Sequence, residues 1–376
     1  MASSSAISLV GCNAALGTAE LPISSIFGYV VGCTGVRVGR KFTEKFEQLC
    51  VAKGKNDGDR ALHAAADLDG RFKRFLSLKE KNQIAHNQSA EKVNKEVRVS
   101  ADGSSYFPGL ADLLVVGPGL VGSLVAKEWI KVNDGQCNVV GQTNTTKRHE
   151  QLRSIGVIPV TKDAHKGEKF PNVIFCAPPS ENEDYAAEVR AAAERWNGEG
   201  SLLFTSSSAV YAVNDNGLCD EGTAPLVPRG ASPRTDRLYR AEEEVLKVGG
   251  NVVRLAGLYV LDRGAHSYYL SQGRVAQRGD HILNLIHCED AASLCVTILR
   301  GEFRSRVFVG CDNHPITRQE IMDAVNKSGK FYKKFEGFTT TEGPLGKKMN
   351  NDLTRRATGW KPNYESFQSF LDVDSS

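Results

Sequence analysis

The feature that most constrains this 376-residue chain is an apolar run that leads directly into a glycine-rich turn. Residues 111–122 read Ala-Asp-Leu-Leu-Val-Val-Gly-Pro-Gly-Leu-Val-Gly, and residues 123–130 that follow have helical character. An apolar run of this length predicts a buried strand, so the segment predicts a strand, a tight turn and a helix in that order. Its glycines have the Gly-x-Gly-x-x-Gly spacing.

Each glycine of this turn has a separate predicted task. Gly117 allows the tight turn, Gly119 leaves room for a pyrophosphate against the backbone, and Gly122 lets helix and strand approach closely. The first helical residues, Leu120 and Val121, would offer free N–H groups at the positive end of the helix dipole. The segment therefore predicts a dinucleotide phosphate site. The alternative is an ordinary glycine-rich turn between a strand and a helix.

After residue 111 the chain alternates short apolar strands with longer helical stretches, which is typical of a parallel sheet. We predict an α/β fold, a doubly wound parallel sheet of the Rossmann type, with a small C-terminal substrate-binding region. The expected strands cover 113–117, 138–141, 157–160, 172–177, 201–206, 251–255 and 306–309, and helices are expected at 183–196 and 235–247. Ligands of such sheets bind at the carboxyl ends of the strands, so Ala177 and Pro178, which end the fourth strand, are candidate cofactor contacts.

The segment after the second expected strand indicates which dinucleotide the site would take. Sites for NAD usually place an acid there, to accept hydrogen bonds from the ribose hydroxyls. Residues 141–148, Gly-Gln-Thr-Asn-Thr-Thr-Lys-Arg, contain no acid. Thr143, Lys147 and Arg148 would instead bind the additional phosphate of NADP, so we expect NADP, with NAD as the alternative. In another interpretation, the two basic residues simply occupy the first turn of an exposed helix.

The N-terminal hundred residues differ in composition from the rest. Residues 1–19 carry no charged side chain and are rich in serine and alanine, which is typical of a chloroplast transit peptide. We expect a transit peptide over 1–50, a polar linker over 51–105, a dinucleotide-binding domain over 106–260 and a substrate region with a returning sheet strand over 261–376. The expected location is the chloroplast stroma; the alternative is a disordered tail.

The composition limits the kinds of partner that this chain is expected to bind. The net charge of +3 does not indicate nucleic acid, and no uninterrupted apolar stretch is long enough for a membrane span. The nine cysteines include no Cys-x-x-Cys pair, and no cysteine or histidine cluster has metal-ligand spacing. We expect a small-molecule substrate, reduced cysteines that serve packing, and no metal site, nucleic-acid partner or membrane span.

Several later segments, taken in order, resemble the extended and atypical short-chain dehydrogenase/reductase superfamily, which contains the NAD-dependent epimerase/dehydratase-like proteins. The resemblance covers residues 110–372. It rests on these segments: Phe-Thr-Ser-Ser-Ser-Ala-Val-Tyr over 204–211, Val-Arg-Leu-Ala-Gly-Leu-Tyr over 253–259, Ile-His-Cys-Glu-Asp-Ala-Ala over 286–292 and Gly-Trp-Lys-Pro over 359–362.

The resemblance implies a serine that orients the substrate oxygen and a tyrosine that transfers a proton, assisted by a lysine four residues later. Ser207 matches the serine, and Tyr239 is the candidate tyrosine. Glu243 stands where the lysine is expected, and a shifted alignment, which brings Thr235 nearer the tyrosine position, does not restore the pair. A glutamate there would raise the pKa of the phenol, whereas proton transfer near neutral pH requires that this pKa be lowered. Arg254 is expected to be a structural ion-pair partner.

Two functions follow. The first is an NADP-binding oxidoreductase or epimerase/dehydratase-type enzyme that acts on a small oxygenated substrate in the plastid. The second, motivated by the missing lysine, is a catalytically inactive nucleotide-binding protein with an assembly or sensing role. The substrate pocket should be built by residues 261–300 and 311–350, including Tyr268, Tyr269, Arg274 and His281, which favour no particular substrate.

Overall fold

The computed structural model describes residues 109–162, 167–179, 184–222 and 224–372. The chain divides into two compact units, Met1–Arg98 and Val99–Ser376, and every described residue belongs to the second. The expected transit peptide over 1–50 and the linker over 51–105 lie outside the described residues.

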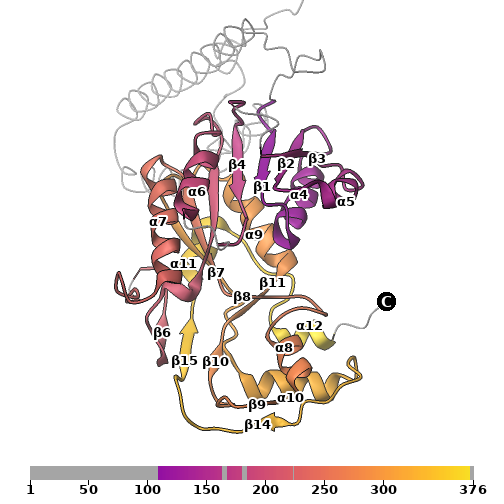
Figure 1. Cartoon of the computed structure of the whole chain (residues 1–376), viewed down its shortest axis with the longest axis vertical. Coiled ribbons are helices and arrows are strands. Elements are labelled where there is room, and N and C mark those ends of the chain that lie inside the picture. Colours follow the sequence, from indigo (N-terminus) through magenta and orange to yellow (C-terminus); the bar gives the residue numbers. More distant parts are fainter. Residues whose placement is uncertain (1–108, 163–166, 180–183, 223, 373–376) are drawn as a thin grey trace, which may run out of the picture. The chain divides into compact units, whose positions relative to one another are not determined.

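A seven-stranded parallel sheet forms the centre of the described part (Figure 1). It begins with β1, an interior strand, and grows from there outward to both edges, which confirms the predicted doubly wound α/β fold. In spatial order its strands are β12 (Val307–Gly310), β7 (Asn251–Leu255), β5 (Leu202–Ser207), β4 (Asn172–Phe175), β1 (Leu113–Val116), β2 (Val139–Thr143) and β3 (Ile158–Thr161). All neighbouring pairs are parallel, and each of the expected strands is present within two residues of its expected bounds.

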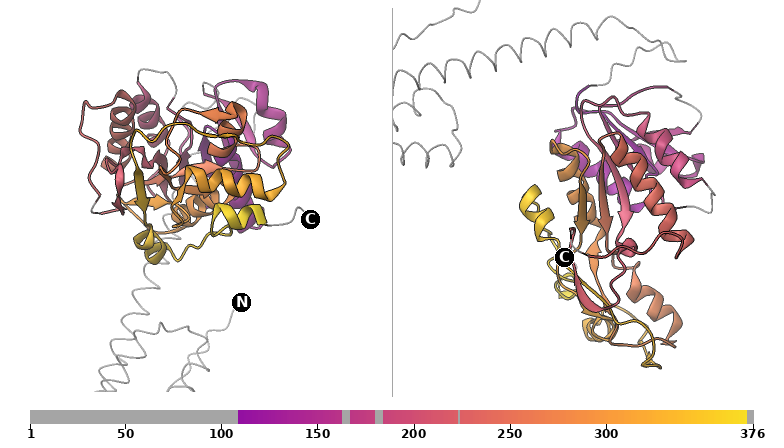
Figure 2. Two further views of the ribbon diagram at one scale, coloured as in Figure 1. Left: turned by 90° about the horizontal axis from the view of Figure 1, so that it is seen from below. Right: turned by 90° about the vertical axis from the view of Figure 1, so that its left-hand side faces the viewer.

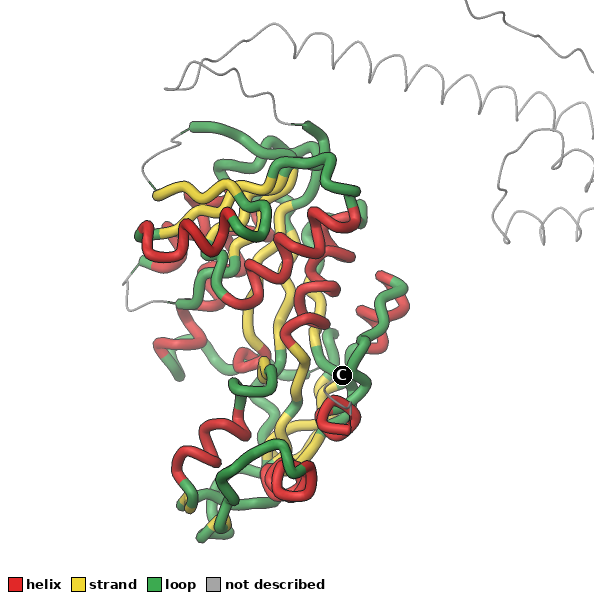
Figure 3. The backbone as a smooth tube through the Cα atoms, turned by 90° about the vertical axis from the view of Figure 1, so that its right-hand side faces the viewer, coloured by secondary structure: helices red, strands yellow, loops and turns green. Residues whose placement is uncertain are grey.

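Helices cover both faces of this sheet (Figure 3). The helices α4 (Leu120–Val132) and α9 (Cys288–Arg300) pack against each other on one face, and α6 (Tyr185–Ala193) and α7 (Pro233–Lys247) on the other. Because both faces are covered, β1 and β4 are buried along their whole length. This is why these strands are continuous apolar runs rather than alternating ones.

The connection from β3 to β4 has no helix in its described part, residues 162 and 167–171. The short helix α5 (His149–Arg153) instead lies between β2 and β3. Side chains of α6 and residues at the carboxyl ends of β1 and β2 line one cavity, the first of the two described below.

A second, smaller apolar cluster is built from the C-terminal third of the chain (Figure 2). It includes residues of α8 (Ala265–Gln272), α10 (Arg318–Ser328) and α12 (Phe367–Asp372). Local sequence sets the bounds of α10: Thr317 and Glu320 form a reciprocal capping box at its start, and Gly329 adopts a left-handed conformation at its end.

Short strands join this cluster to the main sheet. A four-stranded sheet has the order β13 (Ile316–Thr317), β10 (Ile282–Leu283), β15 (Gly346–Met349) and β6 (Asp215–Cys219). Two-stranded sheets pair β11 (Leu285–His287) with β8 (Gly257–Tyr259), and β14 (Gly337–Phe338) with β9 (Arg274–Val275). The helix α11 (Asp352–Thr358) follows β15. No helix within the described ranges has the length and apolar character needed to span a bilayer.

Candidate functional site

The glycine-rich turn has the geometry that its sequence predicts. Gly117 has a positive φ of 77°, and a Cβ atom there would lie 2.6 Å from the backbone of Ala177. A Cβ atom at Gly122 would lie 2.9 Å from the carbonyl oxygen of Gly117 and 3.1 Å from a methyl carbon of Val115. Only glycine fits both positions, so β1 and the start of α4 approach closely.

The start of α4 presents unpaired backbone donors. Ser123 N–H bonds to the carbonyl of Gly119, so the N–H groups of Leu120, Val121 and Gly122 precede the first intrahelical bond. The first turn carries no acidic side chain. A Cβ atom at Gly119 would meet nothing closer than 3.9 Å, which leaves space in front of these donors. Donors at a positive helix end with open space before them fit a diphosphate.

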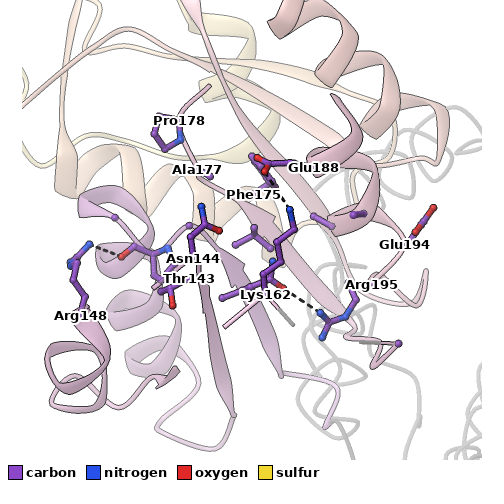
Figure 4. A pocket seen from close by; sticks show the side chains of 18 residues that line it. Thr143, Asn144, Arg148, Lys162, Phe175, Ala177, Pro178, Glu188, Glu194 and Arg195 are labelled. Carbon is purple, nitrogen blue, oxygen red and sulfur yellow. Dashed lines mark hydrogen bonds and ion pairs between the residues drawn. The ribbon is translucent and has the colours of Figure 1, made fainter. Parts of the chain in front are cut away.

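A cavity of about 600 Å³, called the first cavity here, lies at the carboxyl ends of β1, β2 and β4 (Figure 4). Six of the residues proposed as cofactor contacts line it: Gly117, Gly119, Thr143, Arg148, Ala177 and Pro178. Leu120, Val121 and Gly122 lie beside it on α4, and the exposed side chain of Lys147 does not line it. The structure thus distinguishes the two neighbouring basic residues.

The β2 side of the first cavity is polar and holds one cation. The guanidinium of Arg148 donates to the carbonyl of Pro118 at 2.9 Å and to Oε1 of Gln151 at 3.0 Å. The hydroxyl of Thr143 donates to the carbonyl of Val160 at 3.1 Å, so it accepts from Nε2 of His149 at 2.8 Å. Arg148 therefore ties the end of β2 to the glycine turn.

The opposite wall of the first cavity comes from α6 and the end of β3. Lys162 pairs with Glu188 at 3.4 Å, and Arg195 donates to Oε1 of Gln142 at 3.3 Å (Figure 4). Burial lowers the pKa of Arg195. Glu194 also lines this wall. The two acids that line the cavity thus lie on α6 and directly after it, not at the end of β2.

Ser207 lies at the carboxyl end of β5, where the resemblance places the substrate serine. Its Oγ accepts a hydrogen bond from the N–H of Ala209 at 3.2 Å and thereby caps the short helical turn Ser208–Val210. In the sheet order, β5 lies next to β4, whose last residue Phe175 lines the first cavity, and Ser208, which follows Ser207 in the chain, lines the second. Ser207 itself lines neither of these two cavities.

Tyr239 is buried on α7 and does not line either of these cavities. Its hydroxyl is placed between the carbonyls of Val210 at 2.9 Å and Val227 at 2.8 Å, and the guanidinium of Arg229 lies over its ring. Burial raises its pKa, although Arg254 acts in the opposite direction. The proton-transfer role of Tyr239 stays a prediction from the resemblance, and this geometry gives it no support. Glu243, at the expected lysine position, pairs with Arg229 at the surface.

A cavity of about 380 Å³, called the second cavity here, lies beyond the ends of β5 and β7. Its lining includes Tyr211, His281 and Lys347. Of the four side chains expected to build the substrate pocket, His281 lines this cavity. The other three lie elsewhere: Tyr269 is buried in the smaller apolar cluster, Tyr268 is exposed, and Arg274 pairs with Glu336.

A buried ionic network lies directly behind the end of β5. Arg254 donates to both carboxylate oxygens of Glu242, at 3.1 and 2.7 Å, and the hydroxyl of Ser206 donates to the same carboxylate at 2.5 Å. This confirms the expected ion-pair role of Arg254. The guanidinium also lies 5.0 Å from the ring centroid of Tyr211. Burial raises the pKa of Tyr211 to about 12, so this phenol is not a base near neutral pH.

Solved structures provide the comparison for this arrangement, since no family model and no curated protein match the sequence. A conserved protein of unknown function from Silicibacter pomeroyi superposes with a TM-score of 0.57 and 21% identity, over 69% of this chain and 96% of that one. The dTDP-glucose 4,6-dehydratase from Bacillus anthracis, solved with NAD, gives 0.57 and 16%, over 69% and 95%. The UDP-Glc/GlcNAc 4-epimerase from Campylobacter jejuni gives 0.57 and 17%, over 69% and 98%.

The chain shares the fold of these dehydratase and epimerase structures. The likeness spans nearly the whole length of these neighbours, so it includes their C-terminal regions as well as the sheet. This agrees with the resemblance seen in the sequence motifs.

Some site residues were not predicted from the sequence. Gln142 and Asn144 lie in the segment already considered for cofactor choice, so their position after β2 was the available signal. Lys162 directly follows β3 and Arg195 lies two residues after α6, and the arrangement of these elements in space brings both to the first cavity. Lys347 comes from the far end of the chain, and no local pattern marks it.

Proposed function

We propose that this protein binds NADP(H) in the first cavity. The observation that carries the proposal is the combination of three unpaired N–H groups at the start of α4 with an acid-free end of β2. The donors suit the diphosphate, and Arg148, which lines the same cavity, suits the 2′-phosphate. When bound, the nicotinamide would supply hydride transfer, and this chain's own residues would hold and orient it.

Titration with NADPH and NADH tests this proposal, with nucleotide fluorescence as the readout. We expect the full chain to prefer NADPH. Arg148→Ala should weaken NADPH binding about tenfold or more and weaken NADH binding much less, because the 2′-phosphate contact is lost for NADPH alone, whereas the hydrogen bond to the carbonyl of Pro118 is lost in both cases. Lys147→Ala is the matched control, since its side chain does not line the cavity. Failure of the chain to bind either nucleotide would refute the proposal.

We further propose that the nucleotide serves an oxidoreductase or epimerase/dehydratase-type reaction on a small oxygenated substrate. The position of Ser207 supports this, because it ends β5 next to β4, which borders the first cavity, and directly precedes Ser208, which lines the second. The second candidate, a nucleotide-binding protein without turnover, is favoured by the occupied hydroxyl of Tyr239 and the missing lysine. A substrate screen with Ser207→Ala and Tyr239→Phe separates them. If the wild type turns over a substrate and both variants lose that activity, the enzyme with both predicted roles is supported. If the wild type binds NADPH but turns over no substrate, the second candidate is supported.

The proposed location is the chloroplast stroma, on the basis of the uncharged, serine-rich start of the sequence. A fusion of residues 1–50 to a fluorescent protein tests it in plant cells. Accumulation of the fusion in the cytosol would count against a transit peptide.

A further inference from the structure

The second cavity contains one full charge, and that charge is positive. None of the residues that line it is an aspartate or glutamate, whereas Glu188 and Glu194 line the first cavity. The charge is the ammonium group of Lys347 on β15. The rest of the lining is mainly apolar, and it includes Val213, Leu258 and Ile282.

The ammonium group is held in place by the chain itself. Nζ of Lys347 donates to the carbonyl of Ser208 at 3.1 Å and to the carbonyl of Tyr211 at 2.6 Å. An ammonium group has three N–H donors, so one remains after these two bonds. The two carbonyls belong to the segment that directly follows Ser207, so the cation lies next to the end of β5.

Lys347 has no carboxylate partner among the residues that the structure describes. The titratable group that acts on it is the thiol of Cys219, which is neutral near pH 7 because burial raises its pKa to about 11. Burial also lowers the pKa of Lys347. Burying a cation without a counter-ion costs free energy, and an anionic ligand would remove that cost.

His281 adds a second polar contact at the same cavity. Its Nδ1 must carry a hydrogen, because it lies 2.7 Å from the carbonyl of Pro344, which can only accept. In the neutral imidazole this leaves Nε2 as an acceptor, suited to a hydroxyl group of a ligand. Burial lowers the pKa of His281, which favours this neutral form.

From this arrangement we infer that the second cavity binds a small carboxylate with an apolar body, and that Lys347 donates its remaining N–H to the carboxylate. A volume of about 380 Å³ lies at the lower end of the range for small-molecule sites, near 300–1,000 Å³. A single ammonium group matches a monoanion; a phosphate dianion usually attracts arginine or several donors. The inference names a substrate class for the function proposed above. The interpretation of this cavity as a substrate site therefore rests on that proposed function.

Binding of benzoate, benzamide and phenyl phosphate to the full chain tests this inference, with ligand-observed NMR titration as the readout. We expect benzoate to bind more tightly than either analogue, and Lys347→Met to weaken benzoate binding on the order of 10- to 100-fold. Lys348→Met is the matched control, because Lys348 is the adjacent residue of β15 and its side chain is exposed. Equal benzoate affinity in wild type and Lys347→Met would overturn the inference, as would tighter binding of benzamide or phenyl phosphate.

A second measurement needs no substitution, so it holds even if Lys347→Met does not fold. Amine acetylation followed by peptide mapping should modify Lys347 more slowly when benzoate is present, and Lys348 at an unchanged rate. Unchanged acetylation of Lys347 at saturating benzoate would overturn the inference. A parallel NADPH titration separates the two proposals, since loss of NADPH binding with intact benzoate protection refutes only the proposed cofactor.

Discussion

The buried pair between Glu242 and Arg254 provides the sharpest test of the energetics of this fold. Both side chains are nearly inaccessible, with exposed fractions of 4% and 9%. Glu242→Ala removes two hydrogen bonds to Arg254 and one to Ser206, and it leaves a buried guanidinium without its counter-ion. Breaking such a pair costs about 3–5 kcal/mol of the free energy of unfolding.

A surface pair that also uses a glutamate of α7, together with Arg190 of α6, is the matched control. Glu244, two residues further along α7, accepts two hydrogen bonds from Arg190 at 2.8 and 2.9 Å. This geometry is as good as that of the buried pair, but 53% of the Arg190 side chain is exposed. Solvent screens exposed pairs, so we expect Glu244→Ala to leave the urea midpoint unchanged within error.

Urea unfolding followed by tryptophan fluorescence is the suitable assay. All three tryptophans, Trp129, Trp196 and Trp360, belong to the main core, so they report on the sheet and its helices together. The double variant Glu242→Leu/Arg254→Met should recover most of the lost stability, because an apolar pair of similar volume needs no counter-ion. The reasoning would be refuted if Glu242→Ala lowered the midpoint no more than Glu244→Ala, or if the double variant were no more stable than Glu242→Ala.

Two further predictions concern the glycine turn and a buried acid. Gly117→Ala should lower the free energy of unfolding by about 2–4 kcal/mol and abolish NADPH binding, because alanine would have to adopt a positive φ and its methyl group would contact Ala177. Urea unfolding and the nucleotide titration check this. Gly135→Ala is the control, because Gly135 also has a positive φ but its surroundings are open. Burial raises the pKa of Asp312 from 3.8 to about 7, so between these values the folded chain holds a proton that the unfolded chain has lost, and stability falls as pH rises. The free energy of unfolding of Asp312→Asn should therefore increase relative to that of the wild type as pH rises, by at most about 4 kcal/mol above pH 7. A difference in thermal melting between the two proteins that does not depend on pH would contradict this.

Local sequence determined the sheet and the glycine-rich turn. Strand β1 is apolar throughout because both of its faces are covered, and this pattern can be read without knowing what covers it. Gly117 and Gly122 could be assigned their roles because a positive φ and a close helix–strand contact each exclude a side chain. The apolar run and the glycine spacing are local patterns and are visible in the sequence, although the partner that excludes a side chain at Gly117 is Ala177, far along the chain.

Tertiary structure alone decided which side chains line a cavity. Lys147 and Arg148 look equivalent in the sequence, and only the path of the chain after β2 directs Arg148 to the first cavity. Tyr239 matched a catalytic position by its place on a helix, yet its hydroxyl is hydrogen-bonded to the carbonyls of Val210 and Val227. Lys347 bonds a carbonyl 136 positions away, at Tyr211. Such contacts depend on how strands far apart in the chain come together, and no local pattern encodes them.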